Sequence, residues 1–295
     1  MLDGEFSQGP TVMSSVWKSA TPYLSHRHRK TRGSRKDLAE ELASHARAQG
    51  LDAVALTDHD SVEGCERMET ACTKEGLEFI PGAELTAEVT GQEVHILGYW
   101  MDLSFERLRV ELQHSQGVRQ QRVREMVTQL NDNGVSLSVS LVLSLAQCEA
   151  PGRLHVARAL VQQGFARDHD QAFDKFLKRG RPGFVPKARM KAQDAVGLIR
   201  EAGGVAVLAH PGLYRNDSLI GKLKDAGIDG LECWHTRHSP EVSENYSRKA
   251  ADLDLVATGG SDCHGMAKGQ PLIGRVKLPY PQVEALRARR SRRVS

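Results

Sequence analysis

Several histidines and carboxylates of this chain follow, or lie within, short apolar segments. His59 follows AVALTD, His210 follows VAVLA, and Asp262 follows LVATGGS. Glu84 and His95 lie in the neighbouring segments PGAEL and EVHILGY. One histidine in such a place is more often a hydrogen-bonded residue at a strand end than a metal ligand. Neutral imidazoles combined with carboxylates are nevertheless the ligands that Mn²⁺, Zn²⁺ or Fe²⁺ bind, so the set as a whole indicates a metal site.

The elements that would position these residues alternate between apolar strands and helices. The predicted strands are LDAVALT, LEFIPGAEL, EVHILGYW, GGVAVLAHPG, IDGLECW and LDLVATGGSDCHG. Helices are predicted near residues 38–49, 62–74, 192–202, 219–224 and 240–253. Short apolar strands between helices predict an α/β fold with a parallel sheet, either doubly wound or closed into a barrel. Because the carboxyl ends of parallel strands converge on one face, residues distant in sequence are expected to meet there.

Composition and charge place the chain among ordinary globular proteins. Its 295 residues are 40% hydrophobic and 26% charged, and no apolar run approaches the length of a membrane span. The N-terminal sequence lacks the basic-then-apolar order of a secretory signal. The five cysteines are scattered, which predicts free thiols and a cytoplasmic location. The net charge of +3 permits nucleic acid as a partner without implying it.

Residues 104–187 differ from the rest because they contain helical patterns and few strand signals. The segments FERLRVELQHSQGVRQQRVREMVTQL, VARALVQQG and QAFDKFLKRG carry these patterns. We expect a helical insertion here, lying over the mouth of a barrel formed by residues 21–103 and 188–285. Residues 1–20 are predicted to be an N-terminal tail and the basic residues 286–295 a solvated C-terminal tail.

The motifs of the chain, taken in order, resemble those of the PHP (polymerase and histidinol phosphatase) phosphoesterases. They are TDHD with His59, PGAE with Glu84, VHILGY with His95, AHPG with His210, and GGSDCHG with Asp262 and His264. The resemblance covers about residues 37–280. The resemblance is greatest to the bacterial branch of ribonuclease AM and the 3′,5′-nucleotide bisphosphate phosphatases, in which a helical insertion also separates the two halves. RLHVARAL, RGRPGFVPK and RHSPE are similar to that branch as well.

This resemblance implies a distorted (β/α)₇ barrel with two or three divalent ions. Such a protein hydrolyses phosphate esters, here of a nucleotide bisphosphate or short RNA, by metal-activated water. The usual ion would be Mn²⁺, with Zn²⁺ or Fe²⁺ as alternatives. The implied metal ligands are His26, His28, His59, Glu84, His95, His210, Asp262 and His264. Among them, Glu84, Asp262 and His264 would act in catalysis.

A second set of residues suits phosphate recognition. It consists of Arg153, His155, Arg158, Lys187, Arg237 and His238. Guanidinium groups match the geometry of phosphate oxygens. The plainer alternative is ordinary charge on helices and loops, and His155 is equally compatible with a packed side chain.

The segment LSHRHRKTRGS departs from the first metal motif of the family, which reads Asp-Leu-His-x-His with Ser-Asp-Gly a few residues later. His26 and His28 occupy the histidine pair, but no carboxylate occurs from His26 to Lys36. Three explanations stay open: a shifted reading frame, a true loss that leaves fewer metals, or substitution by Asp37. The helix-capping position of Asp37 argues against the last. The two histidines are also compatible with a simple tail.

Two other functions compete with a phosphoesterase. A barrel that has lost catalysis would act as a nucleic-acid-binding or scaffolding protein, and the altered first motif motivates this alternative. An amidohydrolase-type barrel also begins with His-x-His, but the chain offers no candidate for its lysine ligand. The sequence implies no membrane and no protein partner.

Overall fold

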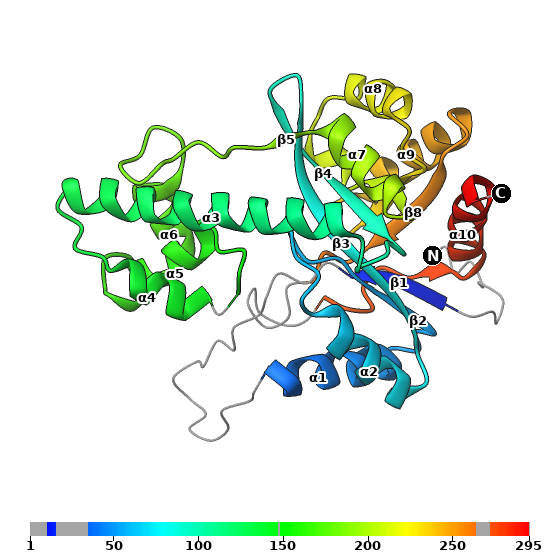
Figure 1. Cartoon of the computed structure of the whole chain (residues 1–295), viewed down its shortest axis with the longest axis horizontal. Helices are drawn as coiled ribbons and strands as arrows, with labels where there is room; N and C mark the ends of the chain where they lie inside the picture. The colour runs from blue at the N-terminus through cyan, green and yellow to red at the C-terminus, as the bar shows by residue number, and fades with distance from the viewer. Residues whose placement is uncertain (1–10, 16–34, 147, 264–271, 295) are drawn as a thin grey trace. The chain divides into compact units, whose positions relative to one another are not determined.

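The computed structural model describes residues 11–15, 35–146, 148–263 and 272–294. The chain forms two compact units (Figure 1). The first unit comprises Met1–Leu108 and Arg189–Ser295, and the second comprises Arg109–Ala188.

The first unit is built on a sheet of nine strands whose pairing path returns to its beginning. The strands are β1 (Thr11–Ser15), β2 (Ala53–Leu56), β3 (Glu78–Val89), β4 (Gln92–Tyr99), β5 (Met190–Lys191), β6 (Val205–Leu208), β7 (Gly230–His235), β8 (Val256–Gly260) and β9 (Leu278–Pro279). Their order is β2-β1-β8-β7-β6-β4-β3-β5, and β2 also pairs with β3. The path from β2 through β1 and β8 to β3 is therefore closed, while β5 and β9 are attached to it. This closure confirms the predicted α/β fold with a distorted barrel.

Strand β4 runs against both of its neighbours and so distorts the barrel. It pairs antiparallel with β3 and with β6, whereas β1–β2, β2–β3, β6–β7 and β7–β8 are parallel pairs. The reversal occurs at Thr90 and Gly91, which have φ values of 49° and 82°. Two such residues make the tight turn that matches the twist of a hairpin. As a result, the beginning of β4 lies beside the carboxyl ends of the parallel strands.

Helices cover the strands and complete the core of the first unit. They are α1 (Arg35–Ala48), α2 (Cys65–Glu75), α7 (Ala192–Glu201), α8 (Ser218–Ala226), α9 (Pro240–Asp252), α10 (Pro281–Val294) and the short 3₁₀ helix η2 (Pro211–Leu213). Ala43 of α1 and Met68 of α2 are buried in one cluster with Val54 of β2. Ala53 of the same strand belongs to another buried cluster. Because β2 is covered on both faces, its sequence is continuously apolar.

Both predicted tails are wrong in part. Thr11–Ser15, within the predicted N-terminal tail, forms β1 and pairs with β2, β8 and β9. Five residues are too few to show a periodic pattern, so only pairing with distant strands reveals this strand. Residues 286–294, within the predicted C-terminal tail, belong to α10. Leu286 is 4% exposed in the core cluster of Ala53, and the guanidinium of Arg287 donates to Glu78 at 2.5 Å.

The second unit is helical, as the sequence indicates. It contains most of α3 (Glu106–Asp132), then α4 (Val139–Ala146), α5 (Arg153–Gln162), α6 (His169–Ala172) and the π-helical turn η1 (Phe173–Leu177). Val123, Met126 and Leu130 of α3 form a buried cluster with Val156 and Leu160 of α5. Spacing of three and four residues places these side chains on one face of each helix. The location of this unit over the barrel mouth stays a prediction.

Candidate metal centre

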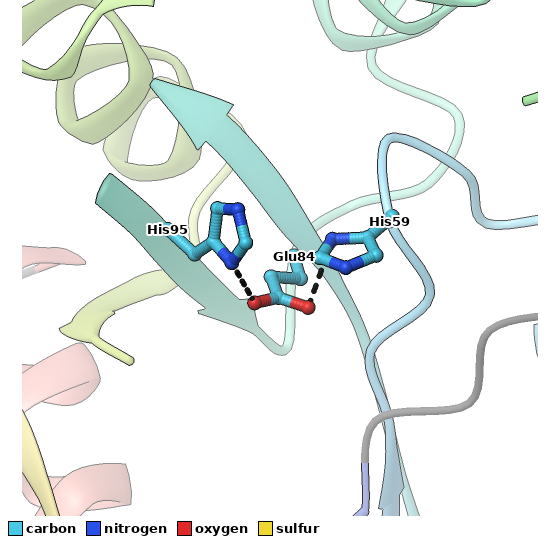
Figure 2. Close-up of side chains that lie close together, drawn as sticks. All are labelled: His59, Glu84 and His95. Atoms are coloured by element: carbon cyan, nitrogen blue, oxygen red, sulfur yellow. Dashed lines mark ion pairs between the residues drawn. The ribbon is translucent and has the colours of Figure 1, made fainter. Parts of the chain in front are cut away.

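The carboxylate of Glu84 lies at the centre of a cluster of histidines in the first unit. Its Oε2 atom is 2.9 Å from Nδ1 of His59, and its Oε1 atom is 2.6 Å from Nδ1 of His95 (Figure 2). Nε2 of His210 is 3.3 Å from the same Oε1 atom and 3.3 Å from Nδ1 of His95. Glu84 is 1% exposed, so this negative charge is removed from water. Residues from three separate segments therefore meet at one carboxylate.

Backbone pairing brings the residues of this cluster together. Glu84 lies inside β3 rather than at its end, and Thr86 and His95 are direct partners across the β3–β4 hairpin. A Cβ atom at Gly82 of the PGAE motif would collide with the carbonyl oxygen of Gly98, so glycine permits this close pairing. His59 forms an isolated parallel bridge with Glu84. The hairpin and this bridge thus place both histidines beside Glu84.

Two buried acids hold the loops that carry His59 and His210. Asp60 accepts hydrogen bonds from the backbone N–H and the Oγ1 hydroxyl of Thr86, at 2.8 and 3.0 Å. His210 follows β6 in a left-handed conformation, with φ of 31°. Its backbone N–H donates to Oε2 of Glu232 at 2.9 Å. A non-glycine residue with positive φ is strained, so the Glu232 contact stabilises the backbone that presents His210.

Asp262 lies on the His210 side of the cluster. Its Oδ2 atom is 3.8 Å from Nε2 of His235, and the rings of His235 and His210 are 5.5 Å apart. The backbone N–H of Arg237 donates to Nδ1 of His235 at 3.1 Å. In the neutral ring the proton is therefore on Nε2, which faces Asp262.

The pKa values of the buried groups follow from burial and from neighbouring charges. Burial opposes the ionisation of Glu84, but His59, His95 and His210 together hold its pKa well below the usual range. Burial lowers the pKa of His210. Burial raises the pKa of Glu232 to about 7.

The cluster fits a divalent cation. Ligand atoms of His59, Glu84 and His95 all lie within 4.8 Å of one another. Among the described residues, Nδ1 of His210 and Oε1 of Glu232 are buried without a hydrogen-bond partner. Buried polar atoms without partners are costly, and facing ring nitrogens such as those of His95 and His210 need a proton or a cation between them. A set of imidazoles around carboxylates is the donor set that Mn²⁺, Fe²⁺ or Zn²⁺ takes.

The remaining predicted ligands, His26, His28 and His264, lie outside the residues that the structure describes. Their roles stay predictions. The predicted ligands that the structure does describe are His59, Glu84, His95, His210 and Asp262.

Three of the predicted phosphate-binding residues of the second unit, Arg153, His155 and Arg158, lie on α5, and the fourth, Lys187, lies shortly before β5. His155 is 8% exposed, and its Nδ1 accepts the backbone N–H of Gly152 at 3.0 Å, which caps the helix. Burial lowers the pKa of His155 to about 4, and the charges of Arg158 and Arg119 add to this effect. Burial also lowers the pKa of Arg158. The guanidinium of Arg153 lies 5.9 Å from the centroid of the Phe173 ring. Lys187 is half-buried.

The other two predicted phosphate-binding residues lie in the first unit, after β7. Arg237 is exposed. His238 is half-buried, its Nδ1 is 2.8 Å from the carbonyl oxygen of Cys233, and its ring is 5.3 Å from that of His235. A Cβ atom at Gly212 would lie 2.8 Å from Nε2 of His238, so the glycine of AHPG makes room for this ring. His238 therefore continues the line of histidines that leads from His210.

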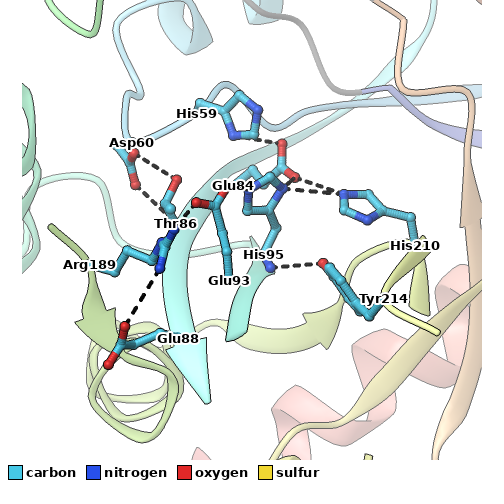
Figure 3. A network of polar contacts seen from close by, with 10 residues as sticks. All are labelled: His59, Asp60, Glu84, Thr86, Glu88, Glu93, His95, Arg189, His210 and Tyr214. Atoms are coloured by element: carbon cyan, nitrogen blue, oxygen red, sulfur yellow. Dashed lines mark hydrogen bonds and ion pairs between the residues drawn. The ribbon is translucent and has the colours of Figure 1, made fainter. Parts of the chain in front are cut away.

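Sequence reasoning missed several residues around the cluster. They are Glu93, Arg189, Tyr214, Glu232 and His235 (Figure 3 shows the first three). Glu232 carried a signal, because it is the only acid inside the otherwise apolar segment GLECW. His235 ends that strand, as His210 follows another, and the same rule would have found it. Tyr214 carried none: its hydroxyl accepts the backbone N–H of His95 at 2.9 Å, a contact across distant segments.

Comparisons with known proteins agree with this geometry. A model of the PHP domain matches residues 26–181. The chain is 32% identical over 229 residues to a 5′-3′ exoribonuclease of Haemophilus influenzae, covering 76% of this chain and 83% of that protein. It is 31% identical over 245 residues to a 3′,5′-nucleoside bisphosphate phosphatase of Chromobacterium violaceum, covering 80% and 85%. A crystal structure of a candidate metal-dependent phosphoesterase from Bifidobacterium adolescentis matches with a TM-score of 0.80 and 27% identity, over 96% of this chain and 98% of that one.

Proposed function

Because the chain belongs to the PHP family and is a metal-dependent phosphoesterase, we propose that it hydrolyses phosphate esters of nucleotides or short RNA. Two relatives support this substrate class, since one is named an exoribonuclease and the other a nucleoside bisphosphate phosphatase. The observation that carries the proposal is the buried carboxylate of Glu84 with three imidazoles within 3.3 Å. Such a site is suited to bind divalent cations, and a phosphate ester bound to these cations can be hydrolysed.

The ion in this proposal is Mn²⁺, in two or three positions. Glu84, His59, His95 and His210 would hold ions within the cluster, and Asp262 would supply a further carboxylate ligand on the His210 side. His264, His26 and His28 would complete these positions. When bound, divalent ions polarise a phosphoryl group and supply a nucleophilic water at neutral pH.

The chain's own residues orient this chemistry. Glu84 and Asp262 supply the negative charge that offsets the cations. Nε2 of His235 is 3.8 Å from Oδ2 of Asp262, too far for a hydrogen bond, and its proton would stabilise the charge of that carboxylate by electrostatic attraction. Glu232 holds the backbone of His210. With these side chains fixed before substrate arrives, little reorganisation is needed during reaction.

Cationic residues would bind the phosphates of the substrate. In the second unit these are Arg153, Arg158 and Lys187, with His155 as a neutral hydrogen-bond donor through Nε2. In the first unit they are Arg237 and His238. Charge-assisted bonds from guanidinium groups to phosphate are among the stronger hydrogen bonds in proteins.

A cytoplasmic location is part of the proposal. The five cysteines are free, which suits a reducing compartment. In the described part of the chain, no helix has the length and apolarity needed to cross a membrane. The names of the relatives do not favour the alternative of a barrel without catalysis.

The test is hydrolysis by the full chain with Mn²⁺. We expect release of inorganic phosphate from 3′-phosphoadenosine 5′-phosphate, or of mononucleotides from a short 5′-phosphorylated RNA. Glu84→Gln and Asp262→Asn should each reduce kcat/KM at least about 100-fold, because each removes a charge that offsets the cations. Glu284→Gln, which changes an exposed acid on α10, is the matched control.

Two outcomes would contradict the proposal. One is full activity in both site variants. The other is RNA binding without turnover by a protein that carries no manganese, iron or zinc in elemental analysis, which would instead support the catalytically impaired barrel.

A further inference from the structure

The two ring nitrogens of His95 face two different carboxylates. Nδ1 is 2.6 Å from Oε1 of Glu84, and Nε2 is 3.3 Å from Oε1 of Glu93. Oε2 of Glu93 accepts a hydrogen bond from Nε of Arg189 at 2.8 Å (Figure 3). A chain of polar contacts therefore runs from Arg189 through Glu93 and His95 to the buried Glu84.

Strand geometry explains why Glu93 reaches His95. The two residues are two positions apart on β4, so their side chains are on the same face of the strand. Glu93 is also the direct cross-strand partner of Glu88 on β3. Two like charges in such a pair repel each other, so a cation beside them is stabilising.

Arg189 provides that cation. Its Nη1 atom is 3.7 Å from Oε2 of Glu88 while its Nε binds Glu93. Arg189 directly precedes β5, which pairs with β3 at Ala87 and Glu88. It is also the first residue after the helical unit, so this contact fixes the returning chain beside the metal cluster. Its side chain is 23% exposed and that of Glu93 32%, which makes the pair less screened than a fully exposed one.

We propose that Glu93 and Arg189 form a positioning pair that selects the tautomer of His95. An ionised carboxylate only accepts hydrogen bonds, and both ring nitrogens of His95 lie beside one. Once a cation lies between Nδ1 and Glu84, the ring proton is on Nε2, where the carboxylate of Glu93 accepts it. Nδ1 then presents its lone pair to the cluster around Glu84, as a metal ligand requires. Arg189 keeps the Glu93 carboxylate oriented and offsets its repulsion from Glu88. The inference rests on the proposed metal site and extends it to residues that do not themselves contact a cation.

The test measures the affinity of the full chain for Mn²⁺, with free Mn²⁺ quantified by its EPR signal. Loss of such a supporting contact to a metal-ligating histidine typically weakens affinity 10- to 100-fold. We expect Glu93→Gln and Arg189→Met each to weaken Mn²⁺ binding about tenfold. The double variant should be about as weak as the weaker single variant, since both changes break one chain of contacts. At saturating Mn²⁺, kcat should return toward the wild-type value with KM unchanged.

Glu88→Gln is the matched control, because it removes a charge from the same hairpin but disturbs only the 3.7 Å contact. Its Mn²⁺ affinity should stay within about twofold of the wild-type value. Arg189→Lys retains the charge without the guanidinium geometry and should restore only part of the loss caused by Arg189→Met.

Glu84→Gln separates this inference from the metal site itself. If Glu84→Gln abolishes Mn²⁺ binding while Glu93→Gln binds Mn²⁺ like the wild type, the positioning pair is excluded and the metal site stands. If Glu84→Gln leaves Mn²⁺ affinity unchanged, the proposed site fails first. Should Arg189→Met prevent folding, the isosteric Glu93→Gln decides the question alone.

Discussion

The Glu84 cluster of the barrel and the His155 region of the helical unit both bury imidazole, but in opposite electrostatic surroundings. Around Glu84, three histidines converge on a carboxylate whose pKa is held well below the usual range. Around His155, the neighbouring charges are the guanidinium groups of Arg158 and Arg119, and the pKa of the ring falls to about 4. The first surroundings suit a cation and the second an anion. Histidine alone therefore does not reveal the ligand; the charge of its neighbours does.

The largest effect that we expect to distinguish the Glu84 cluster from the His155 region is the loss of activity caused by a chelator. Removal of divalent ions with EDTA should lower the activity of the wild-type chain at least about 100-fold, because of the two regions compared it is the Glu84 cluster that combines carboxylate and imidazole donors for the ions. Addition of Mn²⁺ after removal of the chelator should restore the activity, as measured by phosphate release. If activity survives exhaustive chelation, the Glu84 cluster does not act through bound cations, and its contrast with the His155 region as an anion site fails.

Acidification should affect the His155 region through stability. The pKa of His155 is lower in the folded chain than the ordinary value of 6.5, so the unfolded chain takes up a proton first as the pH falls. Folding is therefore destabilised between pH 6.5 and 4, by about 2 kcal/mol at pH 5 from this one group. Urea unfolding at pH 7 and pH 5 should show this loss in the wild type and a smaller loss in His155→Gln.

His114→Gln, which changes an exposed histidine on α3 of the same unit, is the control for this measurement. It should lose as much stability on acidification as the wild type. Equal pH dependence in the wild type and His155→Gln would show that His155 is not held neutral by its surroundings.

The smallest expected effect is on substrate affinity. Arg158→Gln should raise KM for a nucleotide bisphosphate about tenfold and change kcat less, because a charge-assisted bond to phosphate contributes roughly 1.5 to 3 kcal/mol. Arg124→Gln, at an exposed position of α3, should leave both parameters unchanged. A lower kcat with unchanged KM in Arg158→Gln would mean that this residue acts on the reacting group rather than on binding.

Much of the fold was predictable because short apolar strands and amphipathic helices have distinct periods. The alternation of strands and helices, the helical character of residues 104–187 and the family all followed from the sequence. Strand β1 and helix α10 did not, because TVMSS is short and RARRSRR is so basic that the buried Val283 and Leu286 are obscured. The position of Glu84 inside β3, rather than at its end, also depended on the β3–β4 hairpin.

The sequence by itself determined which donors the chain possesses and that His59, Glu84, His95, His210 and Asp262 belong to an ordered set. The tertiary structure alone decided which atoms meet. Strand pairing turns Nδ1 of His95 toward Glu84 and Nε2 toward Glu93. It also brings Arg189 to Glu93 from a segment almost 100 residues away. The physical reason is that side-chain type is local information, whereas register and strand direction are set by hydrogen bonds between segments far apart in the chain.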